Sequence, residues 1–318
     1  VSYTVAIEEV SRACGALGLC TTVHNSVAVF PLLAFGNDAQ KKRWVPDLAQ
    51  GQKIGAFCLT EPNAGSDASG IEATAIPDGD HYVVNANKAL VTNGGVADVC
   101  LIFARTDPSA GRKGISVVVV ERGVAGFKTG DLENLMGMRA NPVSSIRLSD
   151  CRVPRENLLG KEGMGLAIGL KALDVGRIGV AAQAVGIAQA ALEAAVRYAK
   201  QRHQFGVPIA NHQAIQLMIA DMATQVDASR LLVQRAAALR DQGAPFSQES
   251  AMAKLYATEA SSKVTDMAIQ IHGGYGYSKS YPVERYYRDA RVTRIYEGTA
   301  EIHRMVVARG VLQQYSIG

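Results

Sequence analysis

The chain has 318 residues, of which 48% are hydrophobic, 19% are charged and 6% are aromatic, and its formal net charge is +4. This hydrophobic share excludes a disordered chain, and the length indicates more than one structural unit, because single cores stop growing near roughly 250–300 residues. The charge is too small and too evenly spread to indicate a nucleic-acid-binding protein, although it is compatible with a small phosphate-bearing ligand.

Residues 2–49 carry apolar side chains at helical spacing and therefore predict helices. Pro31 and the Gly36-Asn37-Asp38 sequence interrupt this pattern. We expect Asp38 to cap the helix that follows, because a side-chain oxygen at this position accepts from the free backbone N–H groups of the first turn.

The pattern changes between residues 53 and 154, where short β-branched runs alternate with Gly, Asn, Asp and Pro. These runs predict strands at 54–59, 82–92, 99–104, 115–120 and 145–148. The intervals are too short for crossover helices, so we expect an antiparallel sheet or barrel rather than a parallel sheet.

From residue 162 onward the chain is rich in Ala, Leu, Ile and Gln and has long helical periods. One helix face is traced by Ile215, Met218, Met222, Val226 and Leu232. Residues 241–245 form a short connector of the kind that joins antiparallel helices. The whole order predicts an α+β fold with a helical piece at 1–52, a β domain at 53–156 and a helical bundle at 157–318.

The chain shows no sign of a metal site, a disulfide framework or a membrane span. Its five cysteines are dispersed without a Cys-x-x-Cys pair, and its six histidines have no metal-ligand spacing. The cysteines are therefore expected to be reduced, as in cytoplasm or an organelle matrix. The most apolar stretch, 178–196, carries Gln183, Gln189 and Glu193, so we interpret it as a buried helix.

Three glycines at 163–169 resemble a dinucleotide-binding fingerprint, but the spacing has one residue too many and no βαβ unit surrounds it. We therefore favour helix packing over phosphate binding at this segment. No nucleophile-elbow or P-loop sequence occurs, so hydrolase and NTPase functions lose support.

Two polar turns each follow a predicted strand, at residues 60–67 and 88–95. They offer backbone donors and hydroxyl groups that suit a polar cofactor edge or a pyrophosphate. The same residue types are typical of ordinary turns, and composition alone favours that second interpretation.

Glu297 is the candidate general base. It stands between Ile295-Tyr296 and Gly298-Thr299, and Thr299 is suited to cap a new helix. Desolvation by apolar neighbours raises a carboxyl pKa, as a base near neutral pH requires, and Gly298 lets a ligand approach the backbone. The alternative is a solvated acidic residue in the first turn of a helix, and the residues alone do not exclude it.

Five sequence blocks stand in the order found in the acyl-CoA dehydrogenase family, and the chain resembles this family over essentially its whole length. The blocks lie at residues 61–67, 174–177, 202–206, 270–277 and 295–299. Residues 174–181 and 282–291 are similar to the short-chain, butyryl-type branch.

The resemblance implies an α+β fold with N-terminal helices, a central antiparallel β domain and a C-terminal four-helix bundle. It implies FAD bound between the β domain and the bundle, completed by a neighbouring subunit of a homotetramer. The implied reaction is the α,β-dehydrogenation of a short-chain acyl-CoA to the trans-2-enoyl-CoA, with electrons passed to electron-transferring flavoprotein. The implied location is the bacterial cytoplasm or the mitochondrial matrix, without membrane insertion.

The family's functional residues map onto this chain position by position. By resemblance, the FAD contacts are Phe57, Leu59, Thr60, Ser66, Leu90, Val91, Thr92, Arg202, Gln213, Gln270, Ile271, His272, Gly273, Gly274, Thr299 and Glu301. Thr92 would hydrogen-bond near flavin N5. Substrate contacts would come from Ser66, Asp174, Arg177 and Gly298.

Glu297 matches the family's catalytic base, which removes the α-proton of the thioester while the β-hydrogen leaves as hydride. In this family the backbone N–H of the base and a ribityl hydroxyl donate to the thioester oxygen. Arg177 would lie near the base and Asp174 would contact the CoA portion. The isovaleryl branch carries its base at the position of Gly176, so the glycine here disfavours that arrangement.

Two departures from the family are visible. Leu90 stands where most members have Trp or Phe against the flavin, and the N-terminal domain is represented only by its last helices. The chain opens Val-Ser-Tyr inside a helical pattern, and we expect the sequence to be a fragment. Alternatives to the short-chain activity are a branched, cyclic or dicarboxylic acyl-CoA substrate, or a non-catalytic homologue that binds acyl-CoA or flavin.

Overall fold

The computed structural model describes residues 1–315, and backbone contacts divide the chain into two compact units. Unit 1 comprises residues 1–19, residues 135–139 and the described chain from residue 177 onward. Unit 2 comprises residues 20–134 and 140–176. Two units do not test the three-part division at residues 52 and 156, which stays a prediction.

The N-terminal part is helical, as the apolar spacing predicts. Its elements are α1 (Ser2–Ala13), α2 (Gly15–Val23), a π-helical turn (His24–Val29), α3 (Phe30–Phe35) and α4 (Asp38–Ala49). Pro31 does not end the helical run, because residues 15–35 form one continuous helical stretch in which Pro31 follows directly on the π-helical turn. The wider turn before it is the kind of local adjustment seen inside α-helices.

The cap of α4 is Asn37, so the prediction that Asp38 caps this helix is wrong. The Asn37 side chain accepts from the backbone N–H of Gln40 at 2.9 Å, and the Gln40 side chain accepts from the N–H of Asn37 at 3.1 Å. This reciprocal pair is a capping box. Asp38 is the first helical residue, where its negative charge favours the helix dipole.

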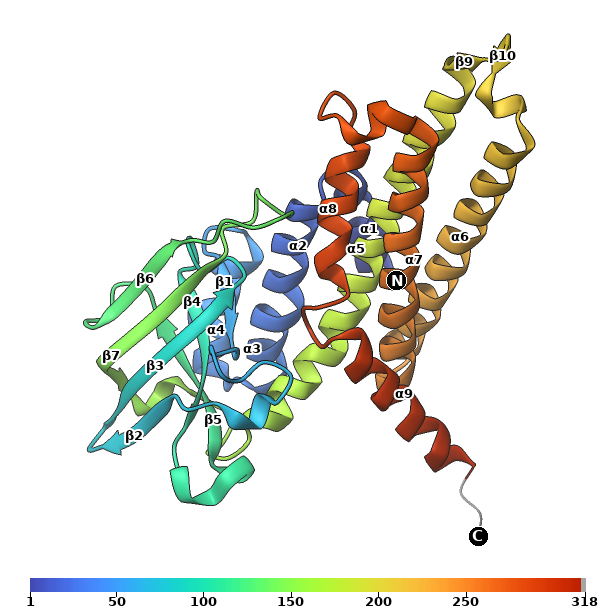
Figure 1. The fold of residues 1–318 in the computed structure, drawn as a ribbon. Helices are drawn as coiled ribbons and strands as arrows, with labels where there is room; N and C mark the ends of the chain where they lie inside the picture. Colours follow the sequence, from blue (N-terminus) through green and yellow to red (C-terminus); the bar gives the residue numbers. More distant parts are fainter. Residues whose placement is uncertain (316–318) are drawn as a thin grey trace. The chain divides into compact units, whose positions relative to one another are not determined.

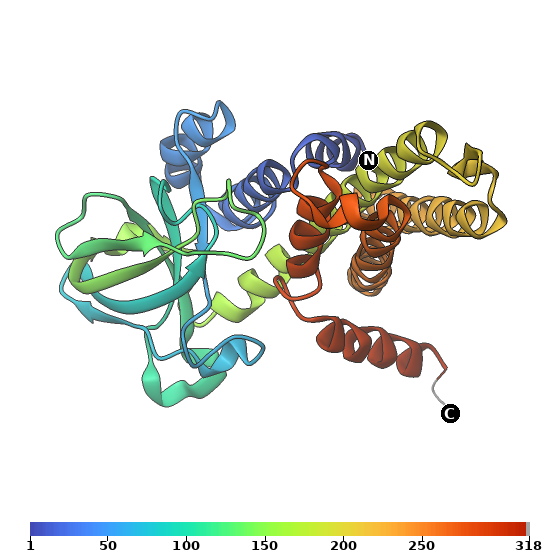
Figure 2. The same cartoon turned by 45° about the horizontal axis from the view of Figure 1, so that its top comes forward.

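The β domain of unit 2 contains one sheet of eight strands within the described residues. The strands are β1 (Gly55–Cys58), β2 (Thr74–Asp78), β3 (His81–Val91), β4 (Val99–Arg105), β5 (Ile115–Glu121), β6 (Phe127–Leu132), β7 (Ser144–Pro154) and β8 (Leu158–Leu159). Seven of them follow the order β6-β7-β3-β2-β4-β5-β8 and β1 pairs with β4 beside this path; Figure 2 shows the strong curvature of the sheet. The pairs are mostly antiparallel, as expected, but β1 and β2 both run parallel to β4, with Gly55 opposite Val99 and Thr74 opposite Arg105.

Both faces of the central strands are buried, which explains their continuous apolar sequence. Alternate residues of β4 point to opposite sides. Cys100, Ile102 and Ala104 pack on one side of the sheet. Leu101 and Phe103 pack on the other, against α3, α4 and the start of α5 (Gly165–Gln201).

The glycines at 163–169 serve packing, as predicted. A Cβ at Gly165 would lie 2.7 Å from the carbonyl oxygen of Ile115, and a Cβ at Gly169 would lie 2.9 Å from the ring of Phe103. These glycines let the start of α5 approach the sheet closely.

Unit 1 is built from long helices that lie side by side (Figure 1). After α5 come α6 (Gln213–Asp241), α7 (Ser247–His272), α8 (Val283–Thr293) and α9 (Ala300–Gln314), together with a small hairpin of β9 (His203–Gln204) and β10 (Val207–Pro208). Short 3₁₀ turns lie in this unit at Ile209–Asn211 and Gly273–Tyr277, and in unit 2 at Ala68–Gly70, Pro108–Gly114 and Arg155–Asn157. The residues after Asp241 join α6 to α7, as predicted.

Two helical stretches, Gly15–Phe35 and Gly165–Gln201, are long and apolar enough to cross a membrane. In the most apolar part of the second, 83% of the residues are buried inside the protein, against 61% in the first. The apolar faces of both are therefore largely covered by protein, as in core helices. This agrees with the interpretation of 178–196 as a buried helix.

Candidate active site

The turn between α8 and α9 presents Glu297 in an unusual backbone conformation. Glu297 has a φ of 52° and Gly298 a φ of 98°, both in the left-handed region. This region costs a non-glycine residue roughly 1–2 kcal/mol. Thr299 begins α9 by accepting from the N–H of Ile302, as predicted. Glu297 therefore precedes the helix and is not a solvated residue of its first turn.

The carboxylate of Glu297 is buried although the residue as a whole is half-buried. Both carboxylate oxygens are inaccessible to solvent and lack a hydrogen-bond partner within the described residues. Burial raises the pKa of Glu297 to about 7, against the opposing effect of the positive charges of Lys254 and Arg177. A carboxyl group in this state is suited to accept a proton near neutral pH.

Lys254 on α7 donates hydrogen bonds to the backbone of this turn. It is fully buried on α7, and its ammonium donates to the carbonyl oxygens of Tyr296 at 2.9 Å and Gly298 at 2.5 Å. Burial lowers the pKa of Lys254 to about 7, while the nearby Glu297 favours its charged form. Burial thus shifts the pKa values of Lys254 and Glu297 toward each other.

A second anchor comes from α5. The hydroxyl of Tyr296 donates to Oε1 of Gln183 at 2.6 Å, and Nε2 of Gln183 donates to the carbonyl oxygen of Gly15 at 2.8 Å. Arg177, on the same helix, is 5% exposed and lowers the pKa of Glu297. The structure thus brings Arg177 close to the candidate base, as the resemblance implies.

His303 closes the turn on the side of α9. It is fully buried, and a Cβ at Gly298 would lie 3.1 Å from its Cε1, so the ring lies against this glycine. Burial and the charges of Lys254 and Arg177 lower the pKa of His303 to about 3. The imidazole is therefore neutral at pH 7 and leaves the charge of the site to Glu297, Lys254 and Arg177.

In unit 2 the structure brings the two polar turns together. The N–H of Ala89 donates to the carbonyl oxygen of Thr60 at 3.0 Å. The buried ammonium of Lys88 donates to the carbonyl oxygen of Leu59 at 3.2 Å and to the carboxylate of Glu61 at 2.6 Å. Glu61 also accepts from two backbone N–H groups, so this buried ion pair is fully hydrogen-bonded.

The residues expected to contact flavin in unit 2 differ in exposure. Leu90 is 60% exposed and has a φ of 53°, at an irregular point of the pairing between β3 and β7. Ser66 is exposed, and Phe57, Thr60 and Thr92 are half-buried. The side chains of Leu59 and Val91 are buried, which leaves their backbone for any ligand contact.

The corresponding residues of unit 1 lie at helix ends. Arg202 follows α5 and stacks on Tyr275 at 5.7 Å, and Gln213 is the exposed first residue of α6. Glu301 lies exposed in the first turn of α9.

The end of α7 carries the remaining expected FAD contacts. Gln270, Gly273 and Gly274 are exposed, whereas Ile271 and His272 are buried. Gly273 has a φ of 57°, and a Cβ at Gly273 or Gly274 would meet open space.

Asp174 and Arg177 are three residues apart on α5 and therefore share a helix face. Gly176 is buried on the same helix, so the alternative position for a base carries no side chain.

Within residues 1–315 no group of three or more His, Cys, Asp or Glu side chains could hold a metal ion.

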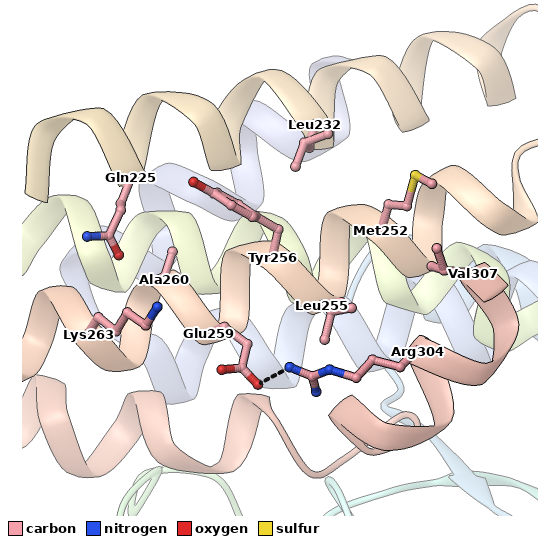
Figure 3. Close-up of a pocket in the computed structure, with 10 residues that line it drawn as sticks. All are labelled: Gln225, Leu232, Met252, Leu255, Tyr256, Glu259, Ala260, Lys263, Arg304 and Val307. Carbon is pink, nitrogen blue, oxygen red and sulfur yellow. Dashed lines mark hydrogen bonds and ion pairs between the residues drawn. The ribbon is translucent and has the colours of Figure 1, made fainter. Parts of the chain in front are cut away.

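A pocket of about 530 Å³ between α6, α7 and α9 does not include Glu297 (Figure 3). It is lined by Gln225, Leu232, Met252, Leu255, Tyr256, Glu259, Ala260, Lys263, Arg304 and Val307. An ion pair between Glu259 and Arg304, at 3.3 Å, crosses one side of it. This pocket is therefore separate from the candidate active site.

Several residues of the site were not predicted from sequence. Lys254, His303 and Gln183 all contact or support the turn of Glu297. The sequence carried one indication that Lys254 is buried. It lies on the same helical face as small residues such as Ser250 and Ala257, which are buried. A lysine on such a face is rarely buried without a partner.

Comparison with known proteins gives the family. Sequence profiles for the N-terminal, middle and C-terminal domains of acyl-CoA dehydrogenase match residues 1–52, 56–151 and 163–312. The chain belongs to the acyl-CoA dehydrogenase family, whose members are FAD-dependent flavoprotein oxidoreductases. The fold seen here, with N-terminal helices, a central β domain and a C-terminal helical domain, is the fold of this family.

The chain is 48% identical to the short-chain specific acyl-CoA dehydrogenase, mitochondrial, of Rattus norvegicus, over 99% of this chain and 76% of that protein. Butyryl-CoA dehydrogenase from Megasphaera elsdenii superimposes with a TM-score of 0.97 at 45% identity, covering 98% of this chain and 82% of that one. A structure described as electron transferring flavoprotein of Acidaminococcus fermentans superimposes with a TM-score of 0.97 at 47% identity, with the same coverage.

The residues present fit FAD. Gly273 and Gly274 leave the space of a Cβ open at the end of α7, and Leu90 is exposed at the end of β3. The carboxylate oxygens of Glu297 have no hydrogen-bond partner within the described residues, so neither is committed to another protein group. The FAD contacts stay predictions from the resemblance, and the buried residues among them would contribute backbone groups only.

Proposed function

We propose that this chain dehydrogenates a short-chain acyl-CoA to the trans-2-enoyl-CoA, with Glu297 as the catalytic base. The observation that carries the proposal is the buried carboxylate of Glu297, whose pKa is raised to about 7 and whose oxygens have no hydrogen-bond partner in the described residues. The short-chain assignment is supported by the relatives from Rattus norvegicus and Megasphaera elsdenii.

Glu297 would remove the α-proton of the thioester and hold it on its carboxylate. The backbone N–H of Glu297 would donate to the thioester oxygen and stabilise the negative charge that develops there. When bound, FAD supplies the acceptor for the β-hydrogen, which leaves as hydride. Arg177 favours the ionised form of Glu297, and the missing side chain of Gly298 lets the ring of His303 lie against the turn.

The test of the base is Glu297→Gln, which keeps the size of the side chain and removes its basicity. We expect kcat with butyryl-CoA to fall by about 10²–10⁴-fold, the usual contribution of a general base, while FAD stays bound. Stopped-flow bleaching of the flavin absorbance measures the step directly. Glu193→Gln, on α5, is the control and should bleach at the wild-type rate, whereas undiminished bleaching in Glu297→Gln would remove the proposed role.

Other acyl groups are the first alternative. A panel of straight, branched, cyclic and dicarboxylic CoA thioesters, compared by kcat/KM, separates these substrates. The proposal expects the highest value for a straight short chain. A maximum with a branched or dicarboxylic thioester would replace it.

The electron acceptor belongs to the same proposal. We infer that reduced enzyme passes its electrons to electron-transferring flavoprotein, supported by the similarity to the structure from Acidaminococcus fermentans. The test compares the rate at which purified electron-transferring flavoprotein reoxidises the reduced enzyme with the rate at which dissolved oxygen does so in its absence. A chain that purifies without flavin and does not bind added FAD would instead be a non-catalytic homologue.

We further propose a homotetramer located in the bacterial cytoplasm or mitochondrial matrix. Unit 1 exposes Phe205 on the β9–β10 hairpin and Leu217 and Leu231 on α6, with 94%, 61% and 60% of each residue accessible. A second copy of the chain would cover such exposed apolar side chains.

A further inference from the structure

Lys254 carries the inference, because its position is costly and needs a compensating role. Its side chain is fully buried on α7, and burial of an ammonium lowers stability unless it is hydrogen-bonded and near an opposite charge. The ammonium meets both conditions at one place, the turn of Glu297. It donates to the carbonyl oxygens of Tyr296 and Gly298, the residues on either side of the base.

The first contact orients the backbone of the base. A peptide unit is planar and trans, so its carbonyl and its N–H point in opposite directions. Lys254 holds the carbonyl of Tyr296, and therefore directs the N–H of Glu297 away from α7. A cation on the carbonyl also polarises the peptide unit and makes its N–H a stronger donor.

The second contact stabilises the strained part of the turn. Glu297 and Gly298 both have left-handed φ values, which persist only where the surroundings enforce them. Lys254 binds the carbonyls before and after Glu297, at 2.9 and 2.5 Å. It therefore spans the strained residue and fixes the direction in which its side chain leaves the backbone.

The charge of Lys254 acts on the same group. The charged and titratable groups around it are Glu297 itself, Arg177 on α5, and Glu301 and His303 on α9. Lys254 lowers the pKa of Glu297 against the effect of burial, more strongly than Arg177 does. Because His303 is neutral at pH 7, it does not replace this charge.

We propose that Lys254 is a positioning residue for the base: it fixes the turn from Tyr296 to Gly298 so that the N–H and carboxylate of Glu297 are presented together, and its charge favours the ionised carboxylate. This inference rests on the proposed function for its link to the reaction. Its effect on Glu297 is a property of the protein alone.

The test uses three variants of the FAD-loaded enzyme. Lys254→Met removes donors and charge, Lys254→Gln keeps amide donors without charge, and Lys254→Arg keeps donors with a charge that does not titrate. The acidic limb of the pH profile of kcat/KM reports ionisation of the base in the free enzyme. We expect this limb to move to higher pH by about one unit in the two neutral variants and to lower pH in Lys254→Arg.

Two further readouts separate positioning from simple destabilisation. We expect kcat to fall further in Lys254→Met than in Lys254→Gln, because only Gln still donates to the carbonyls. The infrared band of the protonated Glu297 carboxyl, identified as the band lost in Glu297→Gln, should titrate with the same shifts without any substrate. Lys263→Met, an exposed lysine of α7, is the matched control and should shift neither readout.

Lower thermal stability with an unmoved limb and an unmoved infrared titration would make Lys254 merely structural and overturn the proposal. If both neutral variants fail to fold, Lys254→Arg decides it, since an unmoved carboxyl band there has the same meaning. The proposed function fails separately, through undiminished flavin bleaching in Glu297→Gln, and the infrared titration still tests the action of Lys254 on Glu297 in that case.

Discussion

Glu297 combines a left-handed backbone, buried carboxylate oxygens without a partner in residues 1–315, and a raised pKa. Each of these features lowers stability, and all three serve a group that must accept a proton from carbon. Strain and unsatisfied polar groups of this kind concentrate at functional sites, where activity is retained at a cost in stability. The turn is also held by a second buried charged group, Lys254, which donates to the carbonyl oxygen of Tyr296.

The cost of burying the ionised Glu297 carboxylate predicts that removing this charge stabilises the protein, but only at the higher pH values at which the carboxylate is ionised. The folded pKa of about 7 lies above the ordinary value of 4.5, so the folded state binds more protons between these values and stability falls as pH rises through them. Glu297→Gln should therefore raise the thermal unfolding temperature at pH 8 and leave it nearly unchanged at about pH 4, below both pKa values. Calorimetry at both pH values measures it, and an equal increase at both would contradict the pKa argument.

The sequence located the base but not the residues that support it. Glu297 could be found because its neighbours are apolar and its block is local in sequence. Lys254 and Gln183 act through contacts to residues tens of positions away, which no local pattern encodes. The helical pattern of small residues around Lys254 placed it on a buried face, but its partner is visible only in the fold.

At the scale of elements, the cap of α4 provides a quantitative test. Asn37→Ala removes one half of the capping box and should lower the free energy of unfolding by about 1 kcal/mol. Asp38→Ala is the matched control, because Asp38 contributes only a favourable charge in the first turn and should cost about 0.5 kcal/mol or less. Urea unfolding of both variants compares them, and a larger loss for Asp38→Ala would restore it as the cap.

The strands show where sequence patterns succeed and where they fail. β1, β3, β4, β5 and β7 were predicted within three residues at most ends because their β-branched runs are buried, except that β7 extends six residues further at its C-terminal end than predicted. β2 contains Pro77, β6 contains Gly130 and charged residues and is largely exposed, and β8 has only two residues. Pairing makes these segments strands, and pairing partners lie elsewhere in the chain. The parallel contact of β1 with β4 was missed for the same reason.

At the scale of the whole molecule, the exposed residues of α6 carry information that the core does not. Leu217 and Leu231 are 14 residues apart, nearly four helical turns, so they lie on one stripe of α6. Two large apolar residues with about 60% of each accessible would add to stability if another surface covered them. The proposed homotetramer provides such a surface from a second copy of the chain.

The tetramer predicts a mass near four times 33.7 kDa in multi-angle light scattering. Changing Leu217 and Leu231 together to Gln should lower this mass at micromolar concentration, because it removes the apolar stripe while leaving the buried face of α6 intact. Ile76→Gln, which replaces an exposed apolar residue of β2 in unit 2, is the control and should keep the wild-type mass. A wild-type monomer would refute the assembly. An unchanged mass in the double variant, with the wild-type circular dichroism spectrum, would move the interface away from α6.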